Sequence, residues 1–239
     1  GGYQITGNKI CCTNSSVADF VVVAARLDGM TGKRAINFFI VDKDSKGFSI
    51  GAPENKMGAR GIPSCPLFFD NVFVNEHALL GKPGEGFGIV MEAFNISRPI
   101  IGARGVGLSQ GALDHALSFV RERRAFGEQV VDFQGVRWML ADMHVQIEAA
   151  RNLVYKAAAS ADAGLTGKAL AMEAAVAKCH ASDTAMRVAT DAVQLFGAAG
   201  ISADYPINRY FRDAKVLQIV EGTQQIQRNI ISRYLVDGI

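Results

Sequence analysis

The sequence predicts an α+β fold: a small antiparallel β-sheet or barrel over residues 1–82, followed by an antiparallel four-helix bundle over residues 83–239. Two observations lead to this prediction. The first part of the chain contains short runs rich in β-branched and aromatic residues. These runs are separated by residues typical of turns. From about Gly84 the pattern changes, and apolar residues recur every three or four positions, as they do along one face of a helix.

Three runs in the first part are expected to form strands: Ala18–Leu27, Ala35–Val41 and Pro66–Val74. The turn signals Asp28-Gly29 and Gly61-Ile62-Pro63 lie between them. Several strands at this spacing are typical of a small antiparallel sheet or barrel.

The second part is expected to contain three long helices and a shorter one. One predicted helix face has apolar residues that step by four, three and four positions: Val136, Leu140, Met143 and Ile147. Gly167–Phe196 is rich in alanine and methionine, as in a buried helix. Gln224–Leu235 is the last predicted helix, with Thr223 as its N-cap. Pro99 interrupts an earlier helical pattern, so we expect a kink or an offset helix start at this residue.

Composition and charge exclude several classes of protein. The chain has 25 lysine and arginine residues against 23 acidic ones, which argues against a general electrostatic grip on nucleic acid. No apolar run approaches the roughly 18 residues needed to span a bilayer, and the first residues do not resemble a signal peptide. Four cysteines without a C-x-x-C pair favour a reducing compartment. Cys179-His180 lacks partners at zinc spacing, so no metal site is expected.

Gly107-Leu108-Ser109-Gln110-Gly111 matches the G-x-S-x-G pattern of a nucleophile elbow, which requires a strand, a sharp turn and a helix. This match lies inside a helical pattern, so Ser109 is expected in the middle of a helix. The small residues around it have another interpretation, close approach of a second helix: Gly102, Ala103, Gly105 and Gly107.

Two charged segments have both a structural and a chemical interpretation. Arg121–Gly127 is a cationic cluster that could compensate the dipole at a helix C-terminus or bind an anion such as a phosphate. Glu221 follows the apolar run Val216–Val220, where a partly desolvated carboxylate could act as a base. From the local sequence alone, an exposed acid near a helix start is the favoured interpretation of Glu221.

Seven strings stand out along the chain: Gly2-Tyr3-Gln4-Ile5-Thr6-Gly7-Asn8-Lys9, Cys12-Thr13-Asn14, Arg123-Arg124-Ala125-Phe126-Gly127, Phe133-Gln134, Gln194-Leu195-Phe196-Gly197, Arg212-Asp213-Ala214-Lys215 and Ile219-Val220-Glu221-Gly222-Thr223-Gln224-Gln225-Ile226-Gln227. In this order they resemble the acyl-CoA dehydrogenase family, and the resemblance runs over the whole chain. That family has N-terminal helices, a middle β domain and a C-terminal four-helix bundle. The resemblance implies that this chain begins on an early strand of the middle domain, without the N-terminal domain.

The resemblance also implies an activity. Members of the family oxidise an acyl-CoA thioester to the trans-2-enoyl-CoA on bound FAD and pass the electrons to an electron-transferring flavoprotein. A glutamate removes the α-proton while the β-hydrogen leaves as hydride to flavin N5. In most members this glutamate lies in the E-G-T string, which is Glu221 here. A minority place it on an earlier helix just before an arginine, and Ser97 before Arg98 occupies that position in this chain.

The remaining site residues follow from the resemblance. The residues expected to contact FAD are Cys11, Cys12, Thr13, Arg123, Phe126, Phe133, Gln134, Gln194, Leu195, Gly197, Thr223 and Gln225. The residues expected to hold the acyl-CoA are Asn95, Arg98, Gly222 and Arg233. Arg123, Phe126 and the Gln194–Gly197 segment would bind the adenosine-pyrophosphate half of a neighbouring subunit's cofactor, which implies a homo-oligomer, a tetramer by resemblance. The expected location is the bacterial cytoplasm or the mitochondrial matrix.

Two alternatives remain open from the sequence. One is an acyl-CoA oxidase on the same fold, which differs in the access of oxygen to the flavin; flavin monooxygenase relatives lack the glutamate base, so Glu221 argues against them. The other is a catalytically silent, oligomerising fragment without a complete flavin site, which the absence of the N-terminal domain favours.

Overall fold

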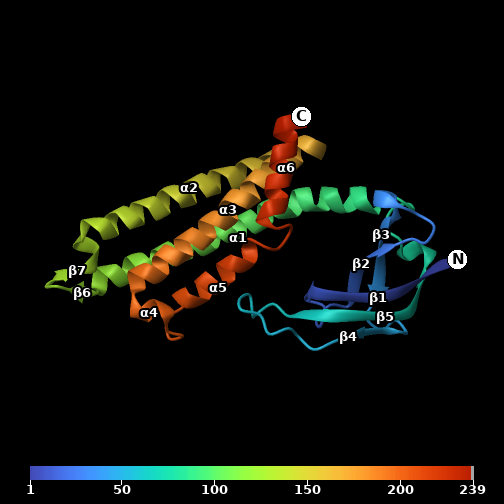
Figure 1. The fold of residues 1–239 in the computed structure, drawn as a ribbon, viewed down its shortest axis with the longest axis horizontal. Helices are drawn as coiled ribbons and strands as arrows, with labels where there is room; N and C mark the ends of the chain where they lie inside the picture. Colours follow the sequence, from blue (N-terminus) through green and yellow to red (C-terminus); the bar gives the residue numbers. More distant parts are fainter. Residues whose placement is uncertain (238–239) are drawn as a thin grey trace. The chain divides into compact units, whose positions relative to one another are not determined.

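A computed structural model describes residues 1–237. They form two compact units, Gly1–Met91 and the part of the chain from Glu92 onward. The division falls within helix α1 (Gly86–Glu122), which begins in the first unit. The predicted combination of antiparallel strands followed by long helices is confirmed (Figure 1).

The first unit contains two antiparallel sheets. One sheet has the order β1-β5-β4, built from β1 (Gly2–Thr13), β5 (Ser64–Asn75) and β4 (Phe48–Ile50). The other is the hairpin of β2 (Phe20–Arg26) and β3 (Ile36–Asp42). Within the described residues these sheets do not close into a barrel. Single-turn helices cover Gly32–Ala35 and Glu76–Ala78.

Alternating side chains of β3 and β5 form the core of this unit, which includes Phe39, Val41 and Val72, all at most 1% exposed. The three predicted strands are confirmed as β2, β3 and β5, with ends that differ by one or two residues. The local pattern did not indicate β1, because only one of its twelve residues, Ile5, is buried. Pairing with β5 decides its conformation instead.

The second unit contains three long helices, which lie side by side in Figure 1. They are most of α1, α2 (Gln134–Asp162) and α3 (Gly167–Phe196). The short α4 (Ala198–Ile201), α5 (Ile207–Leu217) and α6 (Gln224–Asp237) follow. A single-turn helix covers Val130–Asp132. The predicted bounds of α3 are confirmed, and α6 begins at the predicted residue. Helix α5 was not predicted, because it is short and only three of its residues are buried: Ile207, Ala214 and Leu217.

Helix α1 runs continuously through Pro99. The alternative that a helix starts at Pro99 is therefore wrong, because the helix begins at Gly86, thirteen residues earlier. Ser109 lies in the middle of α1, fully buried, and its hydroxyl donates to the carbonyl of Gly105 at 2.8 Å. The helical interpretation of the G-x-S-x-G match is confirmed, and a nucleophile elbow is excluded.

Glycines on α1 allow α2 and α3 to approach closely, as the small residues predicted. A Cβ atom on Gly105 would lie 2.8 Å from the carbonyl oxygen of Ala181 on α3. A Cβ atom on Gly102 would lie 2.8 Å from a methyl carbon of Val154 on α2. These distances are too short for a side chain, so glycine fixes the spacing of the helices here.

Among the described residues, no helix is both long enough and apolar enough to cross a membrane.

Candidate active site

Glu221 lies in the turn between α5 and α6, partly buried, with a left-handed backbone (φ 56°). The backbone N–H of Gln224 donates to the carbonyl of Gln218 at 3.1 Å and closes this turn. A left-handed conformation is costly for a residue with a β-carbon, so the surrounding contacts must hold it. Such outliers gather at functional sites, which makes Glu221 a stronger candidate than its local sequence suggested.

Helix α1 supplies a hydrogen-bond donor to the Glu221 carboxylate. The Ser97 hydroxyl donates to Oε2 of Glu221 at 2.6 Å, a short bond of the kind expected when the acceptor is charged. Glu221 and Ser97, the two positions that the resemblance relates to the catalytic base, are thus in direct contact. In this chain one provides the carboxylate and the other holds one of its oxygens.

Arg98 and Asn95 lie next to the same turn and are buried, at 2% and 5% exposed. The Arg98 guanidinium donates to the carbonyl of Glu221 at 3.4 Å and to Oδ1 of Asn95 at 3.5 Å. Burial lowers the pKa of Arg98, and the nearby Glu221 carboxylate acts in the opposite direction. Of the four residues expected to hold acyl-CoA, Arg98, Asn95 and Gly222 lie at this turn, whereas Arg233 is exposed farther along α6.

Two buried residues that the sequence analysis did not single out bind the carbonyls of the turn. The Lys178 ammonium donates to the carbonyl of Gly222 at 2.8 Å. The Gln227 amide donates to the carbonyls of Glu221 and Gly222 at 3.1 and 2.9 Å. Lys178 could have been noticed, because it lies at helical spacing from the buried alanines of α3, where a lysine is unexpected.

Thr223 and Gln225 begin the next helix. The Thr223 hydroxyl accepts from the backbone N–H of Ile226 at 3.4 Å, as expected for the N-cap of α6. Gln225 is exposed on the first turn of α6, on the opposite side from the buried Gln224 and Gln227.

The arginine-rich segment forms a hairpin rather than simply ending a helix. Two-residue strands β6 (Arg124–Ala125) and β7 (Glu128–Gln129) pair across a turn at Phe126 and Gly127, both with positive φ. This is the conformation of tight hairpin turns. The Phe126 ring is 98% exposed at the tip, and its centroid lies 6.4 Å from that of Phe133. Gln134, the first residue of α2, is also exposed.

Beside this hairpin lies a hollow of about 440 Å³. It brings together four of the residues expected to contact the cofactor: Arg123, Gln194, Leu195 and Gly197. Phe119 and Phe196 also line it, and their rings stack with centroids 4.2 Å apart. The Arg123 guanidinium suits a phosphate, whereas the Phe119 and Phe196 rings stack on each other.

This hollow is distant from Glu221. Gln194 follows Lys178, which contacts the turn, by sixteen residues along α3. At 1.5 Å per residue, that separation is about 24 Å. The predicted cofactor residues of the helical unit therefore form two separate groups.

The third predicted group, Cys11, Cys12 and Thr13, ends β1 in the other unit. Cys11 has a left-handed backbone (φ 56°) and lies within an irregularity in the pairing of β1 with β5, between Lys9 and Cys12. Its backbone N–H and its thiol donate to the Glu54 carboxylate, at 3.2 and 3.3 Å. This hydrogen bond to Glu54 is the main reason why the pKa of the Cys11 thiol is raised. Thr13 is exposed and pairs with Ser64.

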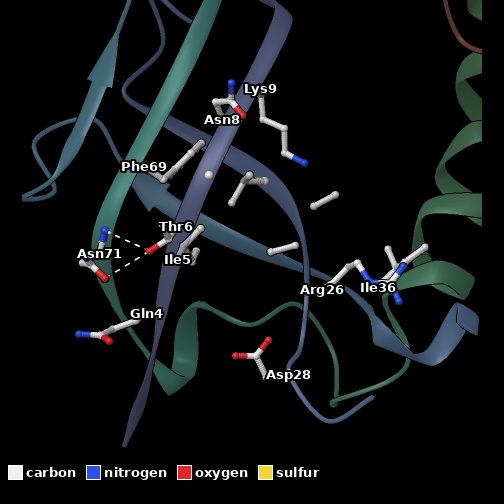
Figure 2. A pocket seen from close by; sticks show the side chains of 14 residues that line it. Gln4, Ile5, Thr6, Asn8, Lys9, Arg26, Asp28, Ile36, Phe69 and Asn71 are labelled. Carbon is white, nitrogen blue, oxygen red and sulfur yellow. Dashed lines mark hydrogen bonds between the residues drawn. The ribbon is translucent and has the colours of Figure 1, made fainter. Parts of the chain in front are cut away.

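The same unit contains a hollow of about 790 Å³ along β1 and β2 (Figure 2). On one wall the Thr6 hydroxyl donates to Oδ1 of Asn71 and accepts from its backbone N–H, both at 3.3 Å. None of the residues expected to contact FAD or acyl-CoA lines this hollow.

Comparison with known proteins identifies the family. Residues 1–72 match the model of the acyl-CoA dehydrogenase middle domain, and residues 84–236 match that of the acyl-CoA dehydrogenase C-terminal domain. The chain belongs to the acyl-CoA dehydrogenase family.

Individual relatives agree with this assignment. The chain is 45% identical over 232 residues to the probable acyl-CoA dehydrogenase FadE25 of Mycobacterium tuberculosis, covering 97% of this chain and 59% of that protein. It is 45% identical over 230 residues to the short-chain specific acyl-CoA dehydrogenase of Clostridium acetobutylicum, covering 96% and 60%. The structure of butyryl-CoA dehydrogenase from Megasphaera elsdenii superposes with a TM-score of 0.95 at 40% identity, over 98% of this chain and 61% of that one. The chain thus spans about three fifths of the length of these relatives.

Proposed function

We propose that this chain carries the catalytic base of an FAD-dependent acyl-CoA dehydrogenase, and that the base is Glu221. The observation that carries the proposal is the Glu221 carboxylate itself, which sits in a strained turn and accepts a 2.6 Å hydrogen bond from Ser97. Contacts that hold one carboxylate oxygen and the backbone of the turn fix the direction in which the carboxylate can take a proton.

The reaction would remove the α-proton of an acyl-CoA thioester and give the trans-2-enoyl-CoA. That proton is weakly acidic, so hydrogen-bond donors must stabilise the negative charge that develops on the thioester oxygen. By resemblance, the backbone N–H of Glu221 is one such donor. Asn95, Arg98, Gly222 and Arg233 remain our assignment for the substrate, with Arg98 and Asn95 acting from buried positions behind the turn.

The residues that the resemblance assigns to FAD fall into groups within each unit. Cys11, Cys12 and Thr13 in the first unit, and Thr223 and Gln225 in the second, would contact the cofactor by resemblance. The group beside the hairpin has the chemistry of an adenosine-pyrophosphate site: Arg123, Phe126, Phe133, Gln134, Gln194, Leu195 and Gly197. When bound, FAD supplies the acceptor for the β-hydride.

By resemblance, the group beside the hairpin would serve the cofactor of a neighbouring subunit. Its separation from the turn supports this assignment, since Gln194 lies about 24 Å along α3 from Lys178, which contacts Gly222. We therefore propose a homo-oligomer, a tetramer by resemblance. Its electrons would pass to an electron-transferring flavoprotein, in the bacterial cytoplasm or the mitochondrial matrix.

An absorption spectrum tests the proposal. The purified chain is mixed with FAD and desalted, and acyl-CoA thioesters are then added without oxygen. We expect a retained flavin band that bleaches on addition of substrate. A colourless protein that cannot be reconstituted would favour the catalytically silent fragment. Rapid oxygen consumption by the reduced protein would favour the oxidase.

Replacing Ser97 by alanine tests the contact to the carboxylate. We expect exchange of the substrate α-proton with solvent to slow about 10- to 100-fold, because a hydrogen bond to a charged group contributes about 1.5–3 kcal/mol. Ser97→Thr retains the hydroxyl and is the control. Equal exchange rates in the wild type and Ser97→Ala would show that this bond does not orient the base.

A further inference from the structure

Lys178 is the most unusual charged residue in the described part of the helical unit, because its side chain is completely buried. It lies on α3 among small apolar residues such as Ala174 and Ala181, which are also buried. Removing an ammonium group from water costs several kcal/mol unless polar groups replace the water. A residue held at such a cost requires an explanation from its contacts.

Both acceptors of the Lys178 ammonium belong to the segment that follows Glu221. Nζ donates to the carbonyl of Gly222 at 2.8 Å and to Oε1 of Gln224 at 3.1 Å. The Gln224 amide in turn donates to the carbonyl of Cys179 at 2.7 Å, the residue after Lys178. Helix α3 therefore holds the start of α6 through two adjacent residues, and the ammonium is the link closest to Glu221.

These contacts determine which way the peptide groups of the turn face. In a trans peptide unit the C=O and the N–H point in opposite directions. The carbonyl of Glu221 accepts from Arg98 and Gln227, and the carbonyl of Gly222 accepts from Lys178 and Gln227. The N–H groups of Gly222 and Thr223, in the same two peptide units, must then point away from these buried side chains. Lys178 thus fixes the plane of the peptide unit directly after Gly222.

The geometry points to Lys178 as a positioning residue for the base: its ammonium holds the carbonyl of Gly222 and thereby keeps Glu221 in the left-handed turn that presents its carboxylate. This role rests on the proposed function of Glu221. It acts through the backbone, because Lys178 contacts the turn and not the carboxylate.

The charge of Lys178 gives the role a measurable pH dependence. Burial lowers the pKa of Lys178 from 10.5 to about 8, and Arg98 on α1 acts in the same direction. Cys179 and Asp183 on α3 and Glu221 in the turn act in the opposite direction. The ammonium is therefore present below about pH 8 and is lost as the pH rises through that value, two units before an exposed lysine would lose its charge.

Amide hydrogen exchange of residues 220–226 tests the proposal without flavin or substrate. We expect exchange at pH 7, relative to the intrinsic rate, to be at least 10-fold faster in Lys178→Met than in the wild type. Lys168→Met, an exposed lysine on the same helix, is the matched control and should match the wild type. Equal protection of this segment in Lys178→Met and the wild type would overturn the proposal.

The wild type alone provides a second test, which does not depend on whether the variant folds. We expect the protection of residues 220–226 to fall between pH 7 and 9, in step with the NMR titration of the labelled lysine side chain. Protection that stays constant while Lys178 deprotonates would also overturn the proposal.

Exchange of the substrate α-proton is the functional measurement. Below pH 8 the wild type should be at least 10-fold faster than Lys178→Met, and the difference should shrink above pH 8 as the wild type loses the ammonium. If the wild type shows no exchange of the substrate α-proton at any pH, the proposed function is wrong. The amide exchange of residues 220–226 still tests the role of Lys178 in that case. If exchange is present but its pH profile is the same in both proteins, the positioning role is wrong.

Discussion

Replacing Glu221 by glutamine is expected to lower the rate of α-proton exchange by about 10²–10⁴-fold, the usual contribution of a positioned general base. Glutamine has nearly the same shape, and its amide oxygen can still accept the hydrogen bond from Ser97. The turn, the fold and any bound flavin should therefore be retained. What the variant lacks is a group that can accept the proton.

The measurement is the incorporation of deuterium at the α-carbon of an acyl-CoA, followed by NMR in heavy water with FAD present. Glu148→Gln, a carboxylate on α2 that pairs with Arg151, is the control and should exchange like the wild type. A Glu221→Gln variant that exchanges as fast as the wild type would remove Glu221 from its assigned role. Ser97 could not act as the base in place of Glu221, because its hydroxyl donates to the carboxylate and is not itself a basic group.

Sequence patterns predicted those parts of the fold in which local and long-range preferences agree. Helix α3 has small apolar residues on every buried face and a glycine with positive φ directly after its end, so its bounds could be predicted. Helix α5 was missed because it is short and only three of its eleven residues are buried. Strand β1 is similar, since the polar sequence Gly7-Asn8-Lys9 becomes a strand by pairing with Leu67–Phe69.

The sequence allowed us to predict which residues belong to the candidate site. It did not allow us to predict how these residues are arranged in space. Nothing in Ile219–Gly222 indicates that Glu221 has positive φ, because some of the contacts that hold this turn come from Arg98 and Lys178, which are distant in sequence. Ser97 contributes from 124 residues away and Lys178 from 44 residues away from its partner Gly222. Such convergence depends on how α1 and α3 pack, which a pattern along one segment does not encode.

The packing of α1 against α3 therefore underlies the site, and two glycines on α1 test it with opposite expected signs. Gly105→Ala should lower the free energy of unfolding by about 1–3 kcal/mol, the usual effect of overpacking. The new Cβ would lie 2.8 Å from the carbonyl oxygen and 3.1 Å from the carbonyl carbon of Ala181, and backbone atoms in a helix cannot rotate aside.

Gly107→Ala is the matched control, two residues along the same helix. Gly107 is exposed, and an added Cβ would meet no atom within 4 Å, so the substitution should raise the free energy of unfolding by up to about 1 kcal/mol through helix propensity alone. Urea unfolding of both variants measures the difference. If Gly105→Ala were as stable as Gly107→Ala, α1 and α3 would not be held at the spacing described. Ser97, which α1 carries two turns before Gly105, would then lack the fixed position from which it reaches Glu221.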